Sequence, residues 1–194
     1  MEAKFSKRLF AYIIDIFVLV VVLFLTNVVI SKNSNIKNIN IELNNLNEKY
    51  LNQEISFNEY LNNYSNLSYK LDKQNIIYMV VNIIFVVGYF IILPYYSNGQ
   101  TIGKKLLKIK IVKQDGKLTI ASLIIRNLIA NGLGYMLLSS LLIYTLSPHA
   151  YFIVTTILTM VQLVLITIIV FGLIKNNGNL VIHDKLSFTK VVNL

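Results

Sequence analysis

The sequence predicts an all-α membrane protein with four transmembrane helices, both termini in the cytoplasm, a short cytoplasmic β-hairpin between helices two and three, and a small helical extracytoplasmic insertion. Three observations carry this prediction. Of the 194 residues, 55% are hydrophobic and only 14% are charged, whereas soluble domains average about 25% charged residues. Four apolar segments are each long enough to cross a hydrocarbon layer of about 30 Å. The cationic residues are concentrated in the connections on one side of these segments.

The four predicted spans form one membrane domain that covers residues 1–194. The first span is a retained helix, because its apolar run exceeds the roughly 7 to 15 residues of a cleavable signal peptide. Only residues 147–150 separate the third span from the fourth, so these two should form an antiparallel hairpin. The spans cover residues 9–30, 76–96, 122–146 and 151–174.

The distribution of Lys and Arg predicts the orientation, because short loops rich in these residues stay in the cytoplasm. Of the 18 cationic residues, 13 lie in or beside the N-terminal flank, the 97–121 loop and the 175–194 tail, and five lie in the 31–75 loop. Both termini are therefore expected in the cytoplasm, with the chain in the plasma membrane. The richness of the sequence in Asn, Ile and Lys suggests an AT-rich bacterial genome. Insertion into the lipid bilayer explains the net charge of +9, so no nucleic acid is expected as a partner.

The extracytoplasmic 31–75 loop carries apolar residues at helical intervals, which predicts a helical hairpin. Ser56 and Glu59 have the spacing of a capping box, which marks the start of the second helix. Two interpretations stay open for this hairpin: a platform for a ligand or partner, or a loosely ordered cap over the span ends.

The cytoplasmic 97–121 loop contains alternating Lys and Ile residues at 108–112, followed by Asp115 and Gly116. This pattern predicts a β-hairpin; the alternative is a basic amphipathic helix on the lipid headgroups. The segment at 99–105 resembles a nucleotide-binding P-loop, but only three residues separate its glycines, and Lys105 replaces the Ser or Thr that would hold magnesium.

Asp15 is the most informative single residue, because a carboxylate within an apolar span must face protein or water. Arg8, Tyr12 and Asp15 fall on one stripe of the first helix. Arg126, in the opening turns of the third span, lies in the same half of the membrane and is the predicted ionic partner of Asp15. The pair is either a titratable or cation-coordinating site that the arginine tunes, or a structural ion pair that sets the helix register.

Polar side chains on the faces of the spans outline a path through the interior, although hydrogen bonds between helices would explain them equally well. The candidates are Tyr12, Asn82, Asn127, Asn131 and Gln162. No metal or other cofactor is expected, because the chain has no cysteine and its two histidines, His149 and His183, are predicted on opposite sides of the membrane. The sequence contains no HExxH or GxSxG motif, so enzymatic activity is not expected.

On these residues, the chain resembles the RDD family of multi-pass bacterial membrane proteins, named for one arginine and two aspartates. Arg8 and Asp15 in RLFAYIID resemble the opening motif of the family, and Asp184 in HDKLSFTKVV resembles the closing one. Phe188 stands where the family usually has a glycine before the threonine. The 31–75 loop is longer than the family pattern suggests. The middle block, which also includes Asp115-Gly116 and Arg126-Asn127, contains a cytoplasmic motif formed by Gly99, Gln100, Thr101, Gly103 and Lys104.

The resemblance implies a transporter, since members of the family are suspected of transport and some resemble cation/proton antiporters. Together with the buried carboxylate it gives the leading hypothesis, in which Asp15 exchanges a proton for a monovalent cation and Arg126 tunes that exchange. Two alternatives belong to other classes. One is a non-catalytic accessory protein that docks a membrane partner or a second copy of itself. The other is a carrier of lipid or a small hydrophobe along the polar faces of spans two and four.

Overall fold

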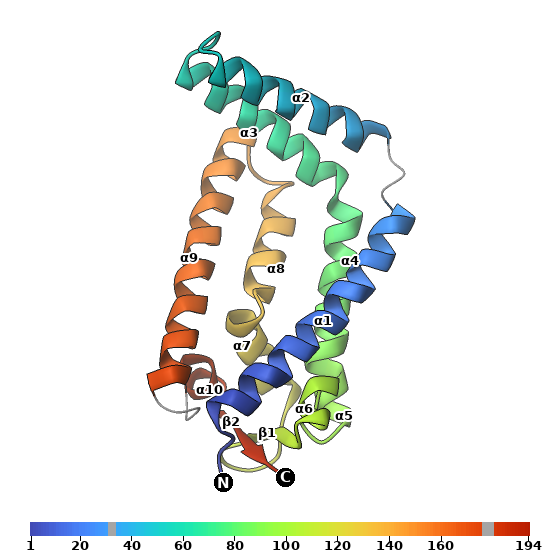
Figure 1. Cartoon of the computed structure of the whole chain (residues 1–194), viewed down its shortest axis with the longest axis vertical. Coiled ribbons are helices and arrows are strands. Elements are labelled where there is room, and N and C mark those ends of the chain that lie inside the picture. The colour runs from blue at the N-terminus through green and yellow to red at the C-terminus, as the bar shows by residue number, and fades with distance from the viewer. Residues whose placement is uncertain (31–33, 176–180) are drawn as a thin grey trace.

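The computed structural model describes residues 1–30, 34–175 and 181–194, and most of them are helical, as predicted (Figure 1). The parts of the predicted loop and tail at 31–33 and 176–180 lie outside the described residues. Within the described ranges, three helical rods are long and apolar enough to cross a membrane. They are α1 (Phe5–Ile30), the continuous rod of α4 (Ile76–Val87), π-helix η1 (Gly88–Ile92) and α5 (Leu93–Tyr96), and α9 (Pro148–Lys175).

The outward faces of these helices are apolar. In α9, only 6% of the most apolar window is buried inside the molecule, and Ile157 and Phe171 are 56% and 69% exposed. Exposing such surface to water costs about 25 cal/mol per Å², a cost that disappears when hydrocarbon replaces water. The helices therefore have the surface of a membrane protein.

The third predicted span, at 122–146, is bent in the structure. This segment is α7 (Ile120–Ala130) followed by α8 (Leu133–Leu142), and the two helices meet at 79°. Gly132 between them has a φ of +67°, a left-handed conformation that side chains with a Cβ rarely adopt. Because the segments before Asn131 and after Gly132 are both apolar, hydropathy alone does not reveal the break. If the bent pair is one span, the described residues contain up to four spans.

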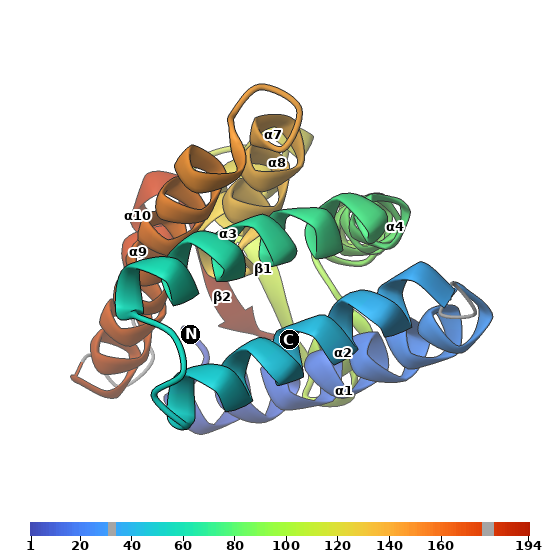
Figure 2. The same cartoon turned by 90° about the horizontal axis from the view of Figure 1, so that it is seen from above.

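The insertion folds as a helical hairpin, α2 (Ser34–Leu51) and α3 (Phe57–Gln74), which lies across one end of the bundle (Figures 1 and 2). The Glu59 amide donates a hydrogen bond to Ser56 Oγ at 3.3 Å, so α3 begins at the predicted cap. α3 packs against both α2 and α9.

Two polar contacts tie α3 to the first turn of α9. The Tyr151 hydroxyl donates a hydrogen bond to Asp72 at 3.1 Å, and Ser65 Oγ lies 2.6 Å from His149 Nδ1. Ser65 and Tyr151 are both buried. The hairpin is therefore packed onto the bundle.

The sheet lies at the opposite end of the bundle from the hairpin and pairs β1 (Ile109–Lys113) with β2 (Thr189–Asn193) in antiparallel register (Figure 1). The alternating segment is thus a strand, but the predicted local β-hairpin is wrong, because the partner strand comes from the C-terminus. The residues after Gly116 lead into α7 instead, where Thr119 Oγ1 accepts a hydrogen bond from the Ser122 amide at 3.2 Å.

Both termini lie at this sheet end (Figure 1). Glu2 forms a β-bridge with Val192, and the Ala3 amide donates to the Val191 carbonyl at 2.9 Å. Glu2 and Ala3 therefore pair with β2 at the edge of the sheet.

A helix–strand unit occurs twice at this end. The first unit is α6 (Ile102–Leu106) with β1, and the second is α10 (Ile182–Leu186) with β2. Each short helix is followed by a residue with positive φ, Lys108 at 54° and Phe188 at 51°. Corresponding residues are 80 positions apart, as Lys108 and Phe188 are, and the counterparts Ile111 and Val191 pair with each other in the sheet. The register is symmetric about that pair, so a local two-fold axis relates the two units.

Candidate functional site

Asp15 of α1 is fully buried and surrounded by donors. The hydroxyls of Tyr89 and Thr101 donate to it at 2.7 and 2.6 Å. The Gly103 amide donates at 2.8 Å, and the Lys104 ammonium lies 3.4 Å from Oδ2. Hydrogen bonds to an ionised carboxylate are stronger than those between neutral groups. This cluster therefore fixes α6 against α1.

The close approach of α6 to α1 requires glycine at position 103. A Cβ there would lie 2.1 Å from the Ala11 carbonyl oxygen and 2.8 Å from Asp15 Oδ1. Thr101 begins α6 as its N-cap, and its hydroxyl accepts from the Lys104 amide at 3.4 Å while donating to Asp15. The motif at 99–104 thus forms the start of α6, which binds the Asp15 carboxylate.

The remaining motif residues join α6 to the sheet. Gly99 has a φ of +83°, and a Cβ there would lie 1.9 Å from the Ile111 carbonyl oxygen. The Ile111 amide donates to the Gly99 carbonyl at 2.8 Å, and Gln100 Nε2 donates to the Ile109 carbonyl at 3.0 Å. The motif therefore joins α1 to β1 through hydrogen bonds and close backbone contacts.

Asp184 of α10 is the second fully buried carboxylate of this end. Arg8 Nη2 donates to its Oδ2 at 2.7 Å, Arg126 Nη1 donates to its Oδ1, and the Val181 amide donates to Oδ2 at 3.3 Å. Burial alone would raise the pKa of Asp184, but the two guanidinium groups outweigh burial and hold that pKa well below its usual range.

Arg126 of α7 makes two further contacts with the second unit. Its Nη1 donates to Thr189 Oγ1 at 2.9 Å, and its Nη2 lies 3.0 Å from His183 Nε2. Burial and the charge of Arg126 lower the pKa of His183 well below its usual value, so this imidazole is neutral. Arg126 thus joins α7 to both α10 and β2.

The predicted ion pair between Asp15 and Arg126 is therefore wrong. Both side chains lie at the sheet end, but Arg126 pairs with Asp184, and Lys104 is the ionic partner of Asp15. The prediction compared only depth in the membrane and did not place the C-terminal helix against α7. The sequence did contain a signal that the C-terminal segment repeats the first unit, because Ile102, Lys105 and Leu106 recur 80 residues later as Ile182, Lys185 and Leu186.

The residues of the predicted polar path separate into three places. Tyr12, Asn127 and Asn131 line an inner cavity of about 210 Å³ at the sheet end. Asn127 Nδ2 donates to the Phe90 and Leu123 carbonyls at 3.1 and 2.7 Å, so this side chain joins α7 to the π-helix. Gln162 Nε2 donates to the Ile129 carbonyl at 3.3 Å, beside the break between α7 and α8.

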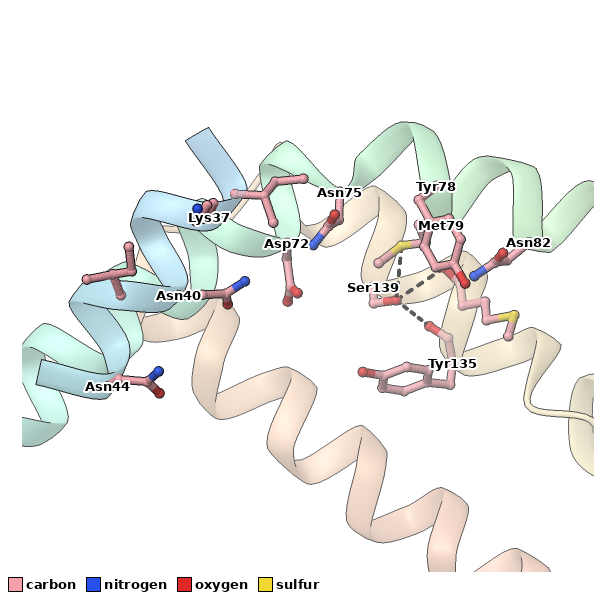
Figure 3. A pocket seen from close by; sticks show the side chains of 13 residues that line it. Lys37, Asn40, Asn44, Asp72, Asn75, Tyr78, Met79, Asn82, Tyr135 and Ser139 are labelled. Carbon is pink, nitrogen blue, oxygen red and sulfur yellow. Dashed lines mark hydrogen bonds between the residues drawn. The ribbon is translucent and has the colours of Figure 1, made fainter. Parts of the chain in front are cut away.

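Asn82 belongs to an outer cavity of about 810 Å³ between the helical hairpin and the bundle. Asp72 of α3, Asn75, Asn82 of α4, and Tyr135 and Ser139 of α8 are among the residues that line it (Figure 3). Lys37, Asn40 and Asn44 of α2 complete its polar lining (Figure 3). The Asn82 Oδ1 atom is buried without a hydrogen-bond partner among the described residues. Burial raises the pKa of Asp72 by desolvating its carboxylate, and the hydrogen bond from the Tyr151 hydroxyl opposes that rise.

The rod of α4 and η1 connects the two ends. Tyr78 and Asn82 line the outer cavity, and Tyr89 in the π-helix donates to Asp15. A π-helix inserts a wider turn that changes the direction of the side chains after it, and such turns are frequent at functional sites. Polar side chains of this one rod therefore lie both at the outer cavity and beside the buried Asp15 carboxylate.

Two buried carboxylates and three cationic side chains at one end of an apolar helical bundle define a membrane protein with a polar, internally paired site. No group of three or more His, Cys, Asp or Glu side chains within the described ranges could hold a metal ion. The chain belongs to the RDD family, whose sequence model matches residues 2–187. No curated protein and no solved structure matches the chain. The three residues that carry the family resemblance are all buried at this site: Arg8, Asp15 and Asp184.

Proposed function

We propose that this RDD protein exchanges a monovalent cation for a proton, with Asp15 as the cation-binding carboxylate and Lys104 as the proton carrier. The observation behind the proposal is the place of the Lys104 ammonium, 3.4 Å from Asp15 Oδ2 and 3.2 Å from Thr101 Oγ1. A monovalent cation in that place would have carboxylate and hydroxyl oxygens as ligands, the donor type that such ions prefer.

The ionisation of Lys104 suits this role. Burial lowers the pKa of Lys104 to about 8; Asp15 opposes the lowering, and Arg126 adds to it. A buried lysine with a pKa near neutrality can release and regain a proton at physiological pH. Arg126 therefore tunes the site through Lys104, not by contact with Asp15.

The exchange balances in charge and atoms. When a cation binds Asp15, one N–H bond of the Lys104 ammonium breaks, the proton leaves to water, and the neutral amine moves away from the carboxylate. When a proton returns to the amine, the ammonium displaces the cation. One positive charge leaves for each that enters, so the exchange is electroneutral.

The outer cavity would supply access from the other end of the bundle, through Asn82 and the Tyr89 hydroxyl that touches Asp15. The excess of Lys and Arg in the N-terminal flank, the 97–121 loop and the tail supports a cytoplasmic location for the sheet end and both termini. The protein would act in the bacterial plasma membrane, with monovalent cations and protons as its substrates. This exchange requires no cofactor and no enzymatic reaction.

The test is cation-driven proton flux in proteoliposomes that contain a pH-sensitive dye. Wild type should move protons on addition of at least one of sodium, lithium or potassium. Asp15→Asn and Lys104→Gln should abolish the flux, whereas the matched control Lys105→Gln, an exposed neighbour, should retain it. The number of protons released per cation bound should fall from near one at pH 7 to near zero above pH 9. Absence of flux in wild type, or flux that survives in Lys104→Gln, would contradict the proposal.

A further inference from the structure

The inner cavity has a cationic wall. Its lining includes Arg8, Lys104 and Arg126, and none of the described residues that line it carries a carboxylate. Asp15 and Asp184 bind these cations but do not themselves line the cavity. The undescribed segments contain no Asp or Glu in the sequence. A concave, cationic wall of this kind attracts an anion.

His183 adds an unused donor to this wall. Its side chain is almost fully buried and lines the cavity. Arginine can only donate, so His183 Nε2 accepts from Arg126 at 3.0 Å, and the neutral imidazole must carry its hydrogen on Nδ1. Nδ1 has no hydrogen-bond partner in the described part of the chain. A buried N–H without an acceptor is unfavourable, and an anionic oxygen would supply the missing acceptor.

Asn131 supplies the complementary group. Its Nδ2 donates to Asn127 Oδ1, and its own Oδ1 is buried without a partner among the described residues. An acceptor in that position fits a hydroxyl. The polar part of the cavity therefore suits an anion that also carries a hydroxyl group, such as a phosphate ester with a glycerol.

Apart from Tyr12 and Asn127, the rest of the lining is apolar, and part of it reaches the surface of the bundle. Leu9 of α1 and Val170 of α9 both line the cavity and are 38% and 44% exposed. α1 packs on α4 and α6, whereas α9 packs on α3, α7, α8 and α10, and the two helices lie on separate sides of the bundle (Figure 2). The cavity rim between α1 and α9 is therefore apolar and exposed at the side of the bundle.

We propose that the inner cavity binds the headgroup of an anionic membrane lipid. Its phosphate lies against Lys104, Arg126 and His183, its hydroxyl lies near Asn131, and its acyl chains leave between α1 and α9. The cavity of about 210 Å³ is smaller than the roughly 300 to 1,000 Å³ of pockets for whole drug-sized ligands, which fits a headgroup whose chains remain outside. The cavity floor is formed by Ile111 and Val191, so the lipid sits where the two helix–strand units meet. This proposal does not depend on cation exchange.

The first test is lipid retention by the full chain. Delipidated protein in detergent is mixed with phosphatidylglycerol, with phosphatidylcholine or with inorganic phosphate, and bound lipid and melting temperature are measured by native mass spectrometry and thermal unfolding. Phosphatidylglycerol should bind at one site and raise the melting temperature, and phosphatidylcholine should not. Equal effects of the two lipids would overturn the proposal. A free anion site, shown by equal stabilisation with inorganic phosphate, would overturn the assignment to a lipid.

Two substitutions on α7 provide matched controls. Ala130 lines the cavity and Ala121 is exposed on the same helix. Ala130→Phe fills the cavity without removing a charge and should abolish the effect of phosphatidylglycerol, whereas Ala121→Phe should retain it. Retention of the effect in a folded Ala130→Phe protein would overturn the proposal.

A second measurement covers the case in which Ala130→Phe does not fold. The chain has no tryptophan, so Val170→Trp at the cavity rim and Phe171→Trp on the exposed side of α9 each introduce one fluorophore. Brominated phosphatidylglycerol should quench Val170→Trp more strongly than brominated phosphatidylcholine does, and the two lipids should quench Phe171→Trp equally. Equal quenching of Val170→Trp by both lipids would overturn the proposal.

Discussion

Lys104 and Asp184 occupy corresponding positions in the two helix–strand units and carry opposite charges. Each pairs with an opposite charge on a helix outside its own unit: Lys104 pairs with Asp15 of α1, and Asp184 pairs with Arg126 of α7 and with Arg8 of α1. The two helix–strand units therefore take part in ion pairs of reversed polarity: the first supplies the cation and the second supplies the carboxylate. Because neither carboxylate is exposed, each pair avoids the large cost of an isolated buried charge.

Gly103→Ala should destabilise the protein by about 1 to 3 kcal/mol, because the new methyl group would overlap the Ala11 carbonyl and push α6 away from Asp15. The measurement is thermal unfolding in detergent. Gly88→Ala is the matched control, since nothing lies within 4 Å of a Cβ at that position. Similar melting temperatures for the two variants would show that α6 does not depend on this close contact.

Lys104 should make stability rise with pH in the alkaline range. Its pKa is lowered from 10.5 to about 8 in the folded protein, so between these values the unfolded chain binds more protons than the folded one. Stability then increases as pH rises from about 8 to 10.5. Unfolding of wild type and Lys104→Met should be compared across this range. The rise should be absent in Lys104→Met, and equal slopes in the two proteins would exclude a lowered pKa for Lys104.

Arg126→Met should destabilise the protein by about 3 to 5 kcal/mol, because breaking one side of a buried ionic network leaves its partners uncompensated. The substitution removes the contacts of Arg126 with Asp184, Thr189 and His183. Lys175→Met, at the exposed end of α9, serves as the control and should change stability little. A loss below about 1 kcal/mol for Arg126→Met, in the range of a surface pair, would mean that the network adds little to the fold.

Phe188 should tolerate glycine and reject valine. Its φ of 51° lies in the left-handed region, which β-branched residues very rarely adopt, and its side chain is 66% exposed, so little packing is lost. Phe188→Gly should melt within a few degrees of wild type, and Phe188→Val should melt clearly lower. The family resemblance, in which glycine is usual here, agrees with this turn. A Phe188→Val protein as stable as wild type would contradict the left-handed conformation.

The sequence by itself determined the properties that depend on local composition. Apolar runs of sufficient length identify helices that suit a membrane, the spacing of Ser56 and Glu59 marks the start of α3, and the alternation at 108–112 identifies a strand. Asp15 and Arg126 were recognisable as buried charges, since an apolar neighbourhood makes any charge conspicuous.

Only the tertiary structure decided which of these elements and charges meet. The partner of β1 is a strand about 80 residues away, Arg126 contacts Asp184 and not Asp15, and a left-handed Gly132 bends the third apolar segment by 79°. Periodicity and hydropathy report how each residue is placed relative to its own neighbours in the chain. Pairing between distant segments depends instead on the packing of the whole bundle, in which the C-terminal helix and strand close against α7 and β1.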